Sequence, residues 1–268
     1  MYPFEYHRPI SAAEAIDLKR ADDGAQWLAG GMTLLPSMKL HLAAPTRLID
    51  LTDVEGLDAW QIDNECVVLG SMTPHARVAE SVELGAKIPA LSAAAAGIGD
   101  PQVRNRGTLG GSIANNDPAA DYPAALLGLG ATIRTSQRDL GADEFFKDIF
   151  ETALGHDELV VAIDFPVPRR AAYLKFRTPG SRYALVGVMV AEVHDGVRVA
   201  VTGAGPGVYR ETRLEAALCA DFRPEALQGI DVSPEELNAD MHGSPEYRAN
   251  LISVLARRAT AQAAASAS

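Results

Sequence analysis

Apolar and polar positions alternate in short runs over the first fifty residues and predict a small unit of strands and helices. Ser11, with Glu14 three residues later, is typical of a helix N-terminus and predicts a helix over 12–20. Short apolar runs on either side of a second helical stretch predict two buried strands. The expected elements are strands over 26–29 and 47–51, with a helix over 34–42 between them. This order of strand, helix and strand indicates an α/β unit.

The pattern changes after this unit, where alanine-rich helical stretches stand between apolar strands. We expect strands over 65–70, 131–135 and 158–165, and helices over 74–83, 89–98, 124–129 and 143–148. Pro166 and Pro168 then interrupt the pattern and indicate a boundary. The sequence therefore predicts one domain over residues 1–168, with subdomains of about 1–52 and 53–168.

Beyond the two prolines, the pattern predicts an antiparallel sheet with helices. Asp195 and Gly196 stand between two apolar runs and are typical of the turn in a β-hairpin. We interpret the glycines of 203–207 as a turn rather than a nucleotide-binding loop, because no long helix begins there. We expect strands over 173–177, 184–193 and 198–202, and helices over 211–219, 223–228 and 245–265. Residues 169–268 are thus a smaller α+β domain, and the predicted fold class of the chain is α+β.

Two segments rich in glycine interrupt the predicted elements. The first glycine segment is residues 29–34 (AGGMTL), and the second is residues 107–112 (GTLGGS). The second lies in a stretch over 104–124 that we expect to be an irregular loop leading into a helix, with Asp121 near the helix N-terminus. Glycine lets a ligand approach the main chain, and helix N-termini attract anions. Both segments are therefore predicted to expose backbone N–H groups to an anion, although the first matches no standard nucleotide-binding motif.

Composition and charge narrow the functional classes. The chain has 268 residues, of which 47% are hydrophobic, and this is enough to bury a sizeable core. No apolar run approaches the roughly 18 residues that span a membrane. Residues 1–10 lack a basic start followed by an apolar stretch, so we expect a cytoplasmic protein. The net charge is −11 with no basic block, which argues against nucleic acid as a partner.

Residue types that usually bind metals are sparse. Cys66 and Cys219 are the only cysteines and have no CxxC spacing, so we expect both to be buried as small apolar residues. An iron–sulfur cluster takes four cysteines, so this chain alone cannot ligate one. The six histidines show no ligand spacing, and we expect no metal site. No residue stands out as a catalytic nucleophile or general base.

Five segments resemble the FAD-binding, or medium, subunit of the molybdenum hydroxylase and xanthine dehydrogenase family, which includes the medium subunit of aerobic carbon monoxide dehydrogenase. They are AGGMTLLPSMK (Ala29–Lys39), TPHARVAES (Thr73–Ser81), NRGTLGGSIANNDPAADYPA (Asn105–Ala124), YLKFRTPGSRYALVGV (Tyr173–Val188) and SPEYRANL (Ser244–Leu251). The resemblance covers nearly the whole chain. It implies a PCMH-type FAD-binding domain of two α/β subdomains over 1–168. A domain of the carbon monoxide dehydrogenase flavoprotein type would follow over 169–268.

The resemblance also implies which residues bind FAD. The pyrophosphate is expected against both glycine segments, where backbone N–H groups and the hydroxyls of Thr33, Thr108 and Ser112 would meet its charge. Asp121 matches an aspartate that accepts hydrogen bonds from the sugar or adenine portion, and a helix N-cap is its alternative role. The matching positions are Ala29, Gly30, Gly31, Met32, Thr33, Leu34, Gly107, Thr108, Gly110, Gly111, Ser112, Asn115, Asp121, Val160, Lys175 and Arg177.

Three of these positions lie outside the glycine segments and the loop. Val160 matches a stretch that packs on the cofactor through backbone or apolar contacts. Lys175 and Arg177 fall in a strand whose basic residue lies near the flavin in the family, and the spacing does not decide between them. A cation there would stabilise negative charge on the reduced ring. The alternative is a surface cation on an edge strand.

By this resemblance, the chain is one of three subunits of a molybdenum hydroxylase. A large subunit with the molybdopterin cofactor oxidises the organic substrate, a small subunit with 2Fe-2S clusters relays electrons, and this chain passes them through FAD to an acceptor. We expect a dimer of such heterotrimers. Two alternatives remain: a standalone FAD-dependent oxidoreductase on the same fold, and a nucleotide-binding protein without redox activity. The substrate and the terminal acceptor stay open.

Overall fold

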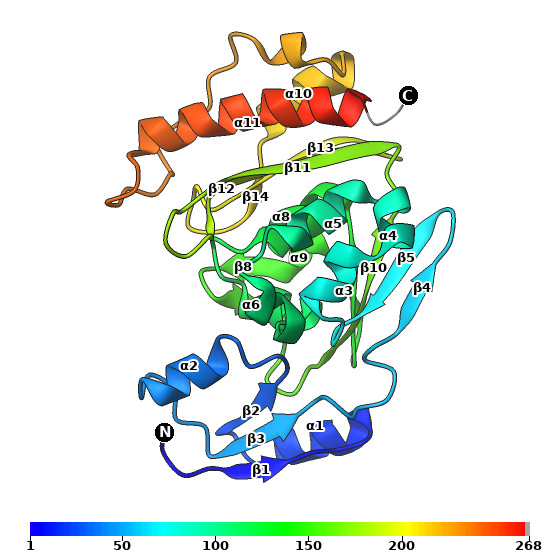
Figure 1. The fold of residues 1–268 in the computed structure, drawn as a ribbon, viewed down its shortest axis with the longest axis vertical. Coiled ribbons are helices and arrows are strands. Elements are labelled where there is room, and N and C mark those ends of the chain that lie inside the picture. The colour runs from blue at the N-terminus through cyan, green and yellow to red at the C-terminus, as the bar shows by residue number, and fades with distance from the viewer. Residues whose placement is uncertain (266–268) are drawn as a thin grey trace.

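Three sheets of three or more strands, and one two-stranded hairpin, make up the strands of the computed structural model, which describes residues 1–265 (Figure 1). The first sheet is parallel, in the order β1-β3-β2. Helix α1 begins as predicted, because the Ser11 hydroxyl accepts a hydrogen bond from the Glu14 N–H and the Glu14 carboxylate accepts one from the Ile10 N–H. The elements are β1 (Glu5–His7), α1 (Ala12–Arg20), β2 (Ala25–Leu28), α2 (Leu34–Lys39) and β3 (Arg47–Asp50).

The second sheet is antiparallel and lies in the middle of the molecule, in the order β4-β5-β10-β6-β7. Its apolar side chains, such as Leu69 and Ile163, pack with those of the surrounding helices in the largest core cluster. The strands are β4 (Trp60–Ile62), β5 (Cys66–Gly70), β6 (Thr132–Thr135), β7 (Asp139–Gly141) and β10 (Val160–Pro166). The helices are α3 (His75–Glu80), α4 (Val82–Lys87), α5 (Pro89–Ala96), α8 (Asp121–Leu129) and α9 (Ala142–Phe145), and a hairpin of β8 (Phe146–Asp148) and β9 (Glu151–Thr152) follows.

The third sheet is antiparallel, in the order β11-β12-β13-β14, and both of its faces are covered. One face contacts α5 and α8, and α11 crosses the other face at the top of Figure 1. Because both faces are buried, β12 is apolar along most of its length instead of alternating. The elements are β11 (Arg170–Arg177), β12 (Ala184–Val193), β13 (Gly196–Thr202), β14 (Tyr209–Arg210), α10 (Thr212–Ala220), the 3₁₀ helix η1 (Pro224–Leu227) and α11 (Pro245–Ala265).

The predicted α+β class is confirmed, and the antiparallel sheet of the C-terminal part forms as expected. Residues 203–207 form a turn, as favoured, and the helix expected over 223–228 is the short η1. The predicted domain boundary at 168 falls between β10 and β11. Because side chains from both sides of it share one core cluster, the division into two domains stays a prediction. Within residues 1–265, no helix is long and apolar enough to cross a membrane.

Two helices expected in the middle layer differ from the structure. The helix expected over 74–83 is two helices, because the Ser81 hydroxyl accepts a hydrogen bond from the Leu84 N–H and begins α4. The helix expected over 143–148 ends at Phe145, and the residues after it form β8. Both differences arise where a local hydrogen bond or strand pairing interrupts a run that is helical in pattern.

The largest difference concerns the stretch over 104–124, which is mostly helical instead of an irregular loop. Two helices, α6 (Pro101–Arg106) and α7 (Leu109–Asn115), precede α8. The Asp100 carboxylate caps α6 by accepting a hydrogen bond from the Val103 N–H. The Thr108 hydroxyl caps α7 by accepting one from the Gly111 N–H. The glycines of the second segment therefore lie at and within the start of a helix.

Candidate functional site

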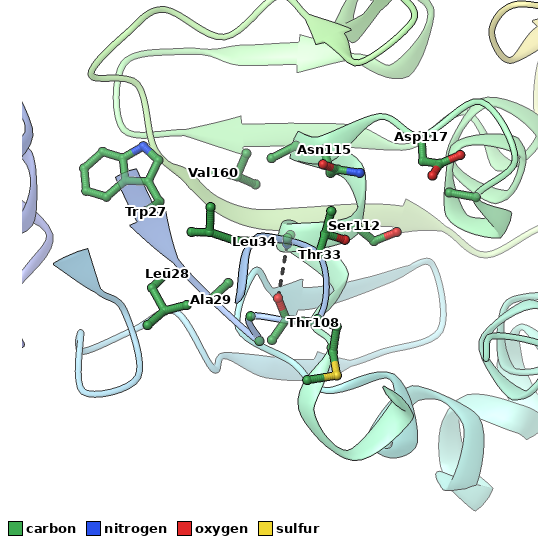
Figure 2. A pocket seen from close by; sticks show the side chains of 18 of the residues that line it. Trp27, Leu28, Ala29, Thr33, Leu34, Thr108, Ser112, Asn115, Asp117 and Val160 are labelled. Carbon is green, nitrogen blue, oxygen red and sulfur yellow. Dashed lines mark hydrogen bonds between the residues drawn. The ribbon is translucent and has the colours of Figure 1, made fainter. Parts of the chain in front are cut away.

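A cavity of about 800 Å³ opens between the first sheet and the helices of the middle layer. This volume lies in the upper part of the range of roughly 300–1,000 Å³ that is usual for small-molecule and cofactor sites. Figure 2 shows one wall formed by the end of β2 and the first glycine segment, and another formed by α7 and Val160 at the start of β10. Residues 181–183, in the connection between β11 and β12, also line the cavity.

Most of the residues expected to bind FAD converge on this cavity, although they come from distant parts of the chain. Fourteen of the sixteen line it, and Lys175 and Arg177 are the two that do not. The lining residues are Ala29, Gly30, Gly31, Met32, Thr33, Leu34, Gly107, Thr108, Gly110, Gly111, Ser112, Asn115, Asp121 and Val160. The fold therefore gathers both glycine segments at one site.

The first glycine segment has free backbone donors. Strand β2 ends at Leu28, and the chain turns through Gly31, whose φ of 71° lies in the left-handed region that glycine adopts without strain. Among residues 1–265, no acceptor is found for the N–H groups of residues 29–33. The Thr33 hydroxyl caps no helix and has no partner in the same part of the chain. This segment can thus offer several N–H groups to an anion in the cavity.

The second glycine segment differs, because the backbone N–H groups of residues 109–112 are already used within the protein. Leu109 N–H donates to the Thr73 carbonyl, and Gly110 N–H donates to the Ser71 carbonyl at 2.7 Å. Gly111 N–H donates to the Thr108 hydroxyl, as the dashed line in Figure 2 marks. The Ser112 N–H donates to the Thr108 carbonyl. The expectation that this segment exposes its N–H groups is therefore wrong for residues 109–112.

The glycines near α7 allow close backbone packing. A Cβ on Gly110 would lie 2.4 Å from the Ser71 Cβ, and a Cβ on Gly30 would lie 2.1 Å from the Arg106 carbonyl oxygen. Such distances are far inside van der Waals contact. Gly30 therefore lets the first segment pack against the end of α6, and Gly110 lets α7 pack against the residues after β5.

Polar side chains of the second wall supply what its backbone does not. Ser112 and Asn115 project from α7 toward the cavity (Figure 2), and neither side chain has a hydrogen-bond partner among the described residues. Thr108 accepts a hydrogen bond, and its hydroxyl hydrogen is not donated to any acceptor in that part of the chain. These three groups are available to a ligand.

Asp121 lies in the first turn of α8 with its carboxylate buried and fully engaged. Its Oδ1 accepts a hydrogen bond from the Tyr173 hydroxyl at 2.6 Å, and its Oδ2 accepts one from the Lys175 Nζ at 2.8 Å. Burial raises the pKa of Asp121 against the opposing effect of Lys175, and burial likewise lowers the pKa of Lys175. The helix N-cap is Ala120, so the alternative role of Asp121 as a cap is excluded.

The structure distinguishes the two candidate cations, Lys175 and Arg177. The Lys175 side chain is buried and paired with Asp121, a residue of the cavity wall, while Arg177 is exposed at the end of β11. Lys175 is thus connected to the cavity through a direct ion pair. The contact joins residues 54 positions apart in the sequence, which local spacing could not reveal.

Sequence reasoning missed several residues of the wall. Ser71, directly after β5, and His75, the first residue of α3, line the cavity, and Asp117 lines it between α7 and α8. Trp27 and Leu28 add an apolar surface from β2 (Figure 2). His75 belongs to the segment TPHARVAES, which was recognised without a role for any of its residues. Its contact with Gly107 joins distant parts of the sequence, so no local signal indicated it.

No candidate metal centre accompanies the cavity. Within residues 1–265, no group of three or more His, Cys, Asp or Glu side chains is arranged to hold a metal ion. Cys66 is half-buried and Cys219 is exposed, so the expectation that both cysteines are buried is wrong. Neither cysteine belongs to the cavity wall.

Comparison with known proteins gives consistent matches. The model of the family described as the FAD-binding domain in molybdopterin dehydrogenase matches residues 2–168. The nicotine 6-hydroxylase medium subunit of Paenarthrobacter nicotinovorans is 34% identical, over 97% of this chain and 97% of its own. The carbon monoxide dehydrogenase medium chain of Hydrogenophaga pseudoflava is 33% identical, over 96% of this chain and 95% of its own.

Solved structures agree with these sequence matches. A chain of quinoline 2-oxidoreductase from Pseudomonas putida 86 has a TM-score of 0.89 at 28% identity, covering 99% of this chain and 98% of that chain. A chain of carbon monoxide dehydrogenase from Hydrogenophaga pseudoflava, in a form that lacks the Mo-pyranopterin moiety, has a TM-score of 0.88 at 32% identity and covers 100% of both chains.

The family recognised from the sequence is therefore confirmed. The relatives are subunits of oxidoreductases and match this chain over nearly their whole length, which favours a subunit over a standalone flavoenzyme or a non-redox nucleotide-binding protein. The chain is an oxidoreductase subunit and belongs to the family of FAD-binding domains of molybdopterin dehydrogenases.

Proposed function

We propose that this chain holds FAD in the cavity between its first two sheets and serves as the medium subunit of a heterotrimeric molybdenum hydroxylase. In this proposal, a small subunit supplies electrons from 2Fe-2S clusters, and a large subunit carries the molybdopterin cofactor. The observation that carries the proposal is the convergence of fourteen expected FAD contacts on one cavity. The relatives that are named medium chains or medium subunits support the partners.

The chemistry of the walls fits a flavin dinucleotide. The free N–H groups of residues 29–33 suit a diphosphate, which needs several convergent donors. Hydroxyl and amide groups of Thr33, Ser112 and Asn115 suit phosphate and sugar oxygens. Trp27 and Val160 provide apolar surface for a ring system. Polar donors at one part of a cavity and apolar walls at another are what a dinucleotide with a flat ring requires.

The roles of the side chains follow from this assignment. Bound FAD supplies a redox centre that exchanges electrons with one-electron carriers, and the protein binds, orients and tunes it. The first glycine segment anchors the diphosphate, and α7 contributes Ser112 and Asn115 from the opposite wall. The buried pair of Lys175 and Asp121 fixes the start of α8 at the cavity and places a positive charge behind its wall. We assign no catalytic acid or base to this chain.

An absorption spectrum of the complex purified from its native host tests this function. The expected result is a flavin spectrum with added iron–sulfur absorption, two co-purifying subunits, and FAD released on heating. A colourless protein that takes up no added FAD would contradict the cofactor assignment. Full substrate turnover by the isolated chain would contradict the heterotrimer.

Two finer statements belong to the same proposal. We infer a dimer of heterotrimers, which native mass measurement of the purified complex checks, and a single heterotrimer would be the contrary result. We also infer a cytoplasmic location, supported by the two cysteines, which form no disulfide. Fractionation of the host cells tests it, and recovery of the complex in an exported fraction would contradict it.

A further inference from the structure

The residues from the end of β5 to the first residue of α3 run along the second glycine segment and place two polar residues in the cavity wall. The Ser71 carbonyl accepts a hydrogen bond from the Gly110 N–H, and the His75 N–H donates one to the Gly107 carbonyl at 3.0 Å. Ser71 and His75 both line the cavity, and each is only 4% exposed. Neither was expected from the sequence to contact FAD.

Both side chains carry buried polar atoms without a partner. The Ser71 Oγ and the His75 Nδ1 have no hydrogen bond within the part of the chain that the structure describes. A buried polar group without a partner destabilises the folded protein. Of the residues with such atoms, Ser71 and His75 are the two that line the cavity, so a ligand bound there is a candidate partner for both.

The local packing maintains this arrangement. A Cβ on Gly107 would lie 2.6 Å from the His75 Nε2, so the glycine leaves room for the imidazole ring. The Tyr122 ring also packs against the imidazole, with ring centroids 5.3 Å apart. Burial, with a smaller effect of Arg104, lowers the pKa of His75 to about 4, so the ring is neutral at physiological pH. Ser71 and His75 thus present neutral hydrogen-bonding groups.

The position of these groups points to one part of the proposed ligand. The N–H groups of residues 109–112 are used internally, so the second wall has no free backbone donors there. Ser71 and His75 lie beside the second glycine segment. The end of α6, next to His75, packs against Gly30 of the first segment. Two of the charged groups in the wall, Asp121 and Glu158, are already paired with Lys175 and Arg138.

We propose that Ser71 and His75 are FAD-binding residues whose Oγ and imidazole form hydrogen bonds with the diphosphate and its adjoining sugar oxygens. This inference rests on the proposed binding of FAD to this cavity. It assigns the second wall a set of neutral side-chain donors and acceptors, where the first wall uses backbone N–H groups.

The test measures FAD affinity and the thermal stability of the FAD-free full-length chain for matched variants. Ser71→Ala should weaken FAD binding about five- to tenfold, as loss of one to one and a half kcal/mol of hydrogen bonding implies. The same variant should leave the melting temperature of the FAD-free protein unchanged or raise it, because it removes an unpaired buried hydroxyl. A purely structural role would lower the melting temperature and leave the affinity unchanged, and that result overturns the proposal.

Ser92→Ala is the matched control. The Ser92 Oγ is also buried without a partner, but this residue of α5 does not line the cavity. Its FAD affinity should equal that of the unmodified protein. An equal loss of affinity in Ser71→Ala and Ser92→Ala would show a general effect of the substitution and overturn the assignment.

His75→Phe supplies an independent variant that keeps a ring and removes both nitrogens. It should weaken FAD binding at least about fivefold, and binding of ADP, which carries the diphosphate, should weaken by a similar factor. Weaker FAD binding with unchanged ADP binding would show that His75 contacts the flavin half of FAD, and it would overturn the diphosphate assignment. If the unmodified chain binds no FAD, the proposed function fails; if it binds FAD and both variants bind equally well, only this inference fails.

Discussion

The two glycine segments look alike in the sequence and differ in the structure. In the first, residues 29–34, the backbone N–H groups up to Thr33 have no acceptor among residues 1–265 and face a cavity. In the second, residues 109–112 donate all their N–H groups to neighbouring carbonyls or to Thr108. A pair of glycines can therefore serve ligand access or close packing of the protein backbone. The partner of each N–H group distinguishes the two roles.

Because of this difference, the two walls of the cavity offer different groups to a ligand. The first wall offers main-chain donors, and their position depends on a turn through Gly31. The second wall offers side chains held by a tightly packed backbone, and its position depends on internal contacts. Substitutions of the residues that pack the backbone of the second wall should therefore act mainly on stability. Substitutions of ligand-facing side chains in either wall should act mainly on ligand affinity.

The largest effect is expected where the second wall depends on a buried charge pair. Lys175→Met should lower the free energy of unfolding by about 3–5 kcal/mol, because it leaves the Asp121 carboxylate buried without its cation. Arg177→Met, on the same strand but exposed, should change it by less than about 0.5 kcal/mol. Urea unfolding of both variants without FAD measures the difference, and equal effects would contradict the distinction between these cations.

Gly110→Ala should cost about 3 kcal/mol of stability, because the new methyl group would lie 2.4 Å from the Ser71 Cβ and 2.8 Å from the Ser71 carbonyl oxygen. Gly207→Ala is the control, since a Cβ there meets no atom within 4 Å. Chemical unfolding without FAD is the measurement. A stable Gly110→Ala protein that had lost only FAD affinity would show that this glycine serves the ligand and not the packing.

Acid should weaken the second wall through His75. Burial lowers the pKa of His75 from its ordinary value of 6.5 to about 4, so between these values the unfolded chain binds more protons than the folded one. Stability therefore falls as pH falls through this window, by about 2 kcal/mol between pH 7 and pH 5. His75→Phe should lack this part of the pH dependence. Identical pH profiles for the variant and the unmodified chain would contradict a buried, neutral imidazole.

The smallest effect on stability is expected in the first wall. Thr33→Ala should change the free energy of unfolding by less than about 0.5 kcal/mol, since its hydroxyl caps no helix, and should weaken FAD binding about fivefold. Ser81→Ala gives the opposite pattern, because its hydroxyl caps α4. It should cost about 1 kcal/mol of stability and no affinity. Calorimetric titration with FAD and urea unfolding separate the two patterns.

Local signals explain which parts of the fold were predictable. The helix Ala12–Arg20 was predicted with its bounds because Ser11 and Glu14 form a capping arrangement within four residues. The stretch over 104–124 was expected as a loop because its glycines and asparagines outweighed weaker signals. Asp100 before Pro101 is itself a helix-start pattern, and Thr108 is a second cap. Glycine lowers helix propensity, but packing against Ser71 outweighs that cost here.

The site was predictable where it lies in the glycine motifs and less so elsewhere. The resemblance placed both segments, Asn115 and Val160 at one ligand, and the cavity gathers them. The choice between Lys175 and Arg177 depended on a contact across 54 residues, which no local pattern encodes. Ser71 lies in the wall because it follows strand β5 and packs against Gly110 of α7. Only the three-dimensional arrangement could therefore identify it.

Amide hydrogen exchange of the full chain with and without FAD tests the difference between the walls most directly. Without FAD, the N–H groups of residues 29–33 should exchange rapidly, and those of residues 109–112 should already be protected by their hydrogen bonds. Saturating FAD should protect residues 29–33 strongly and change residues 109–112 little. If bound FAD left residues 29–33 unprotected, or if residues 109–112 exchanged rapidly until FAD was added, the assignment of the two walls would be contradicted.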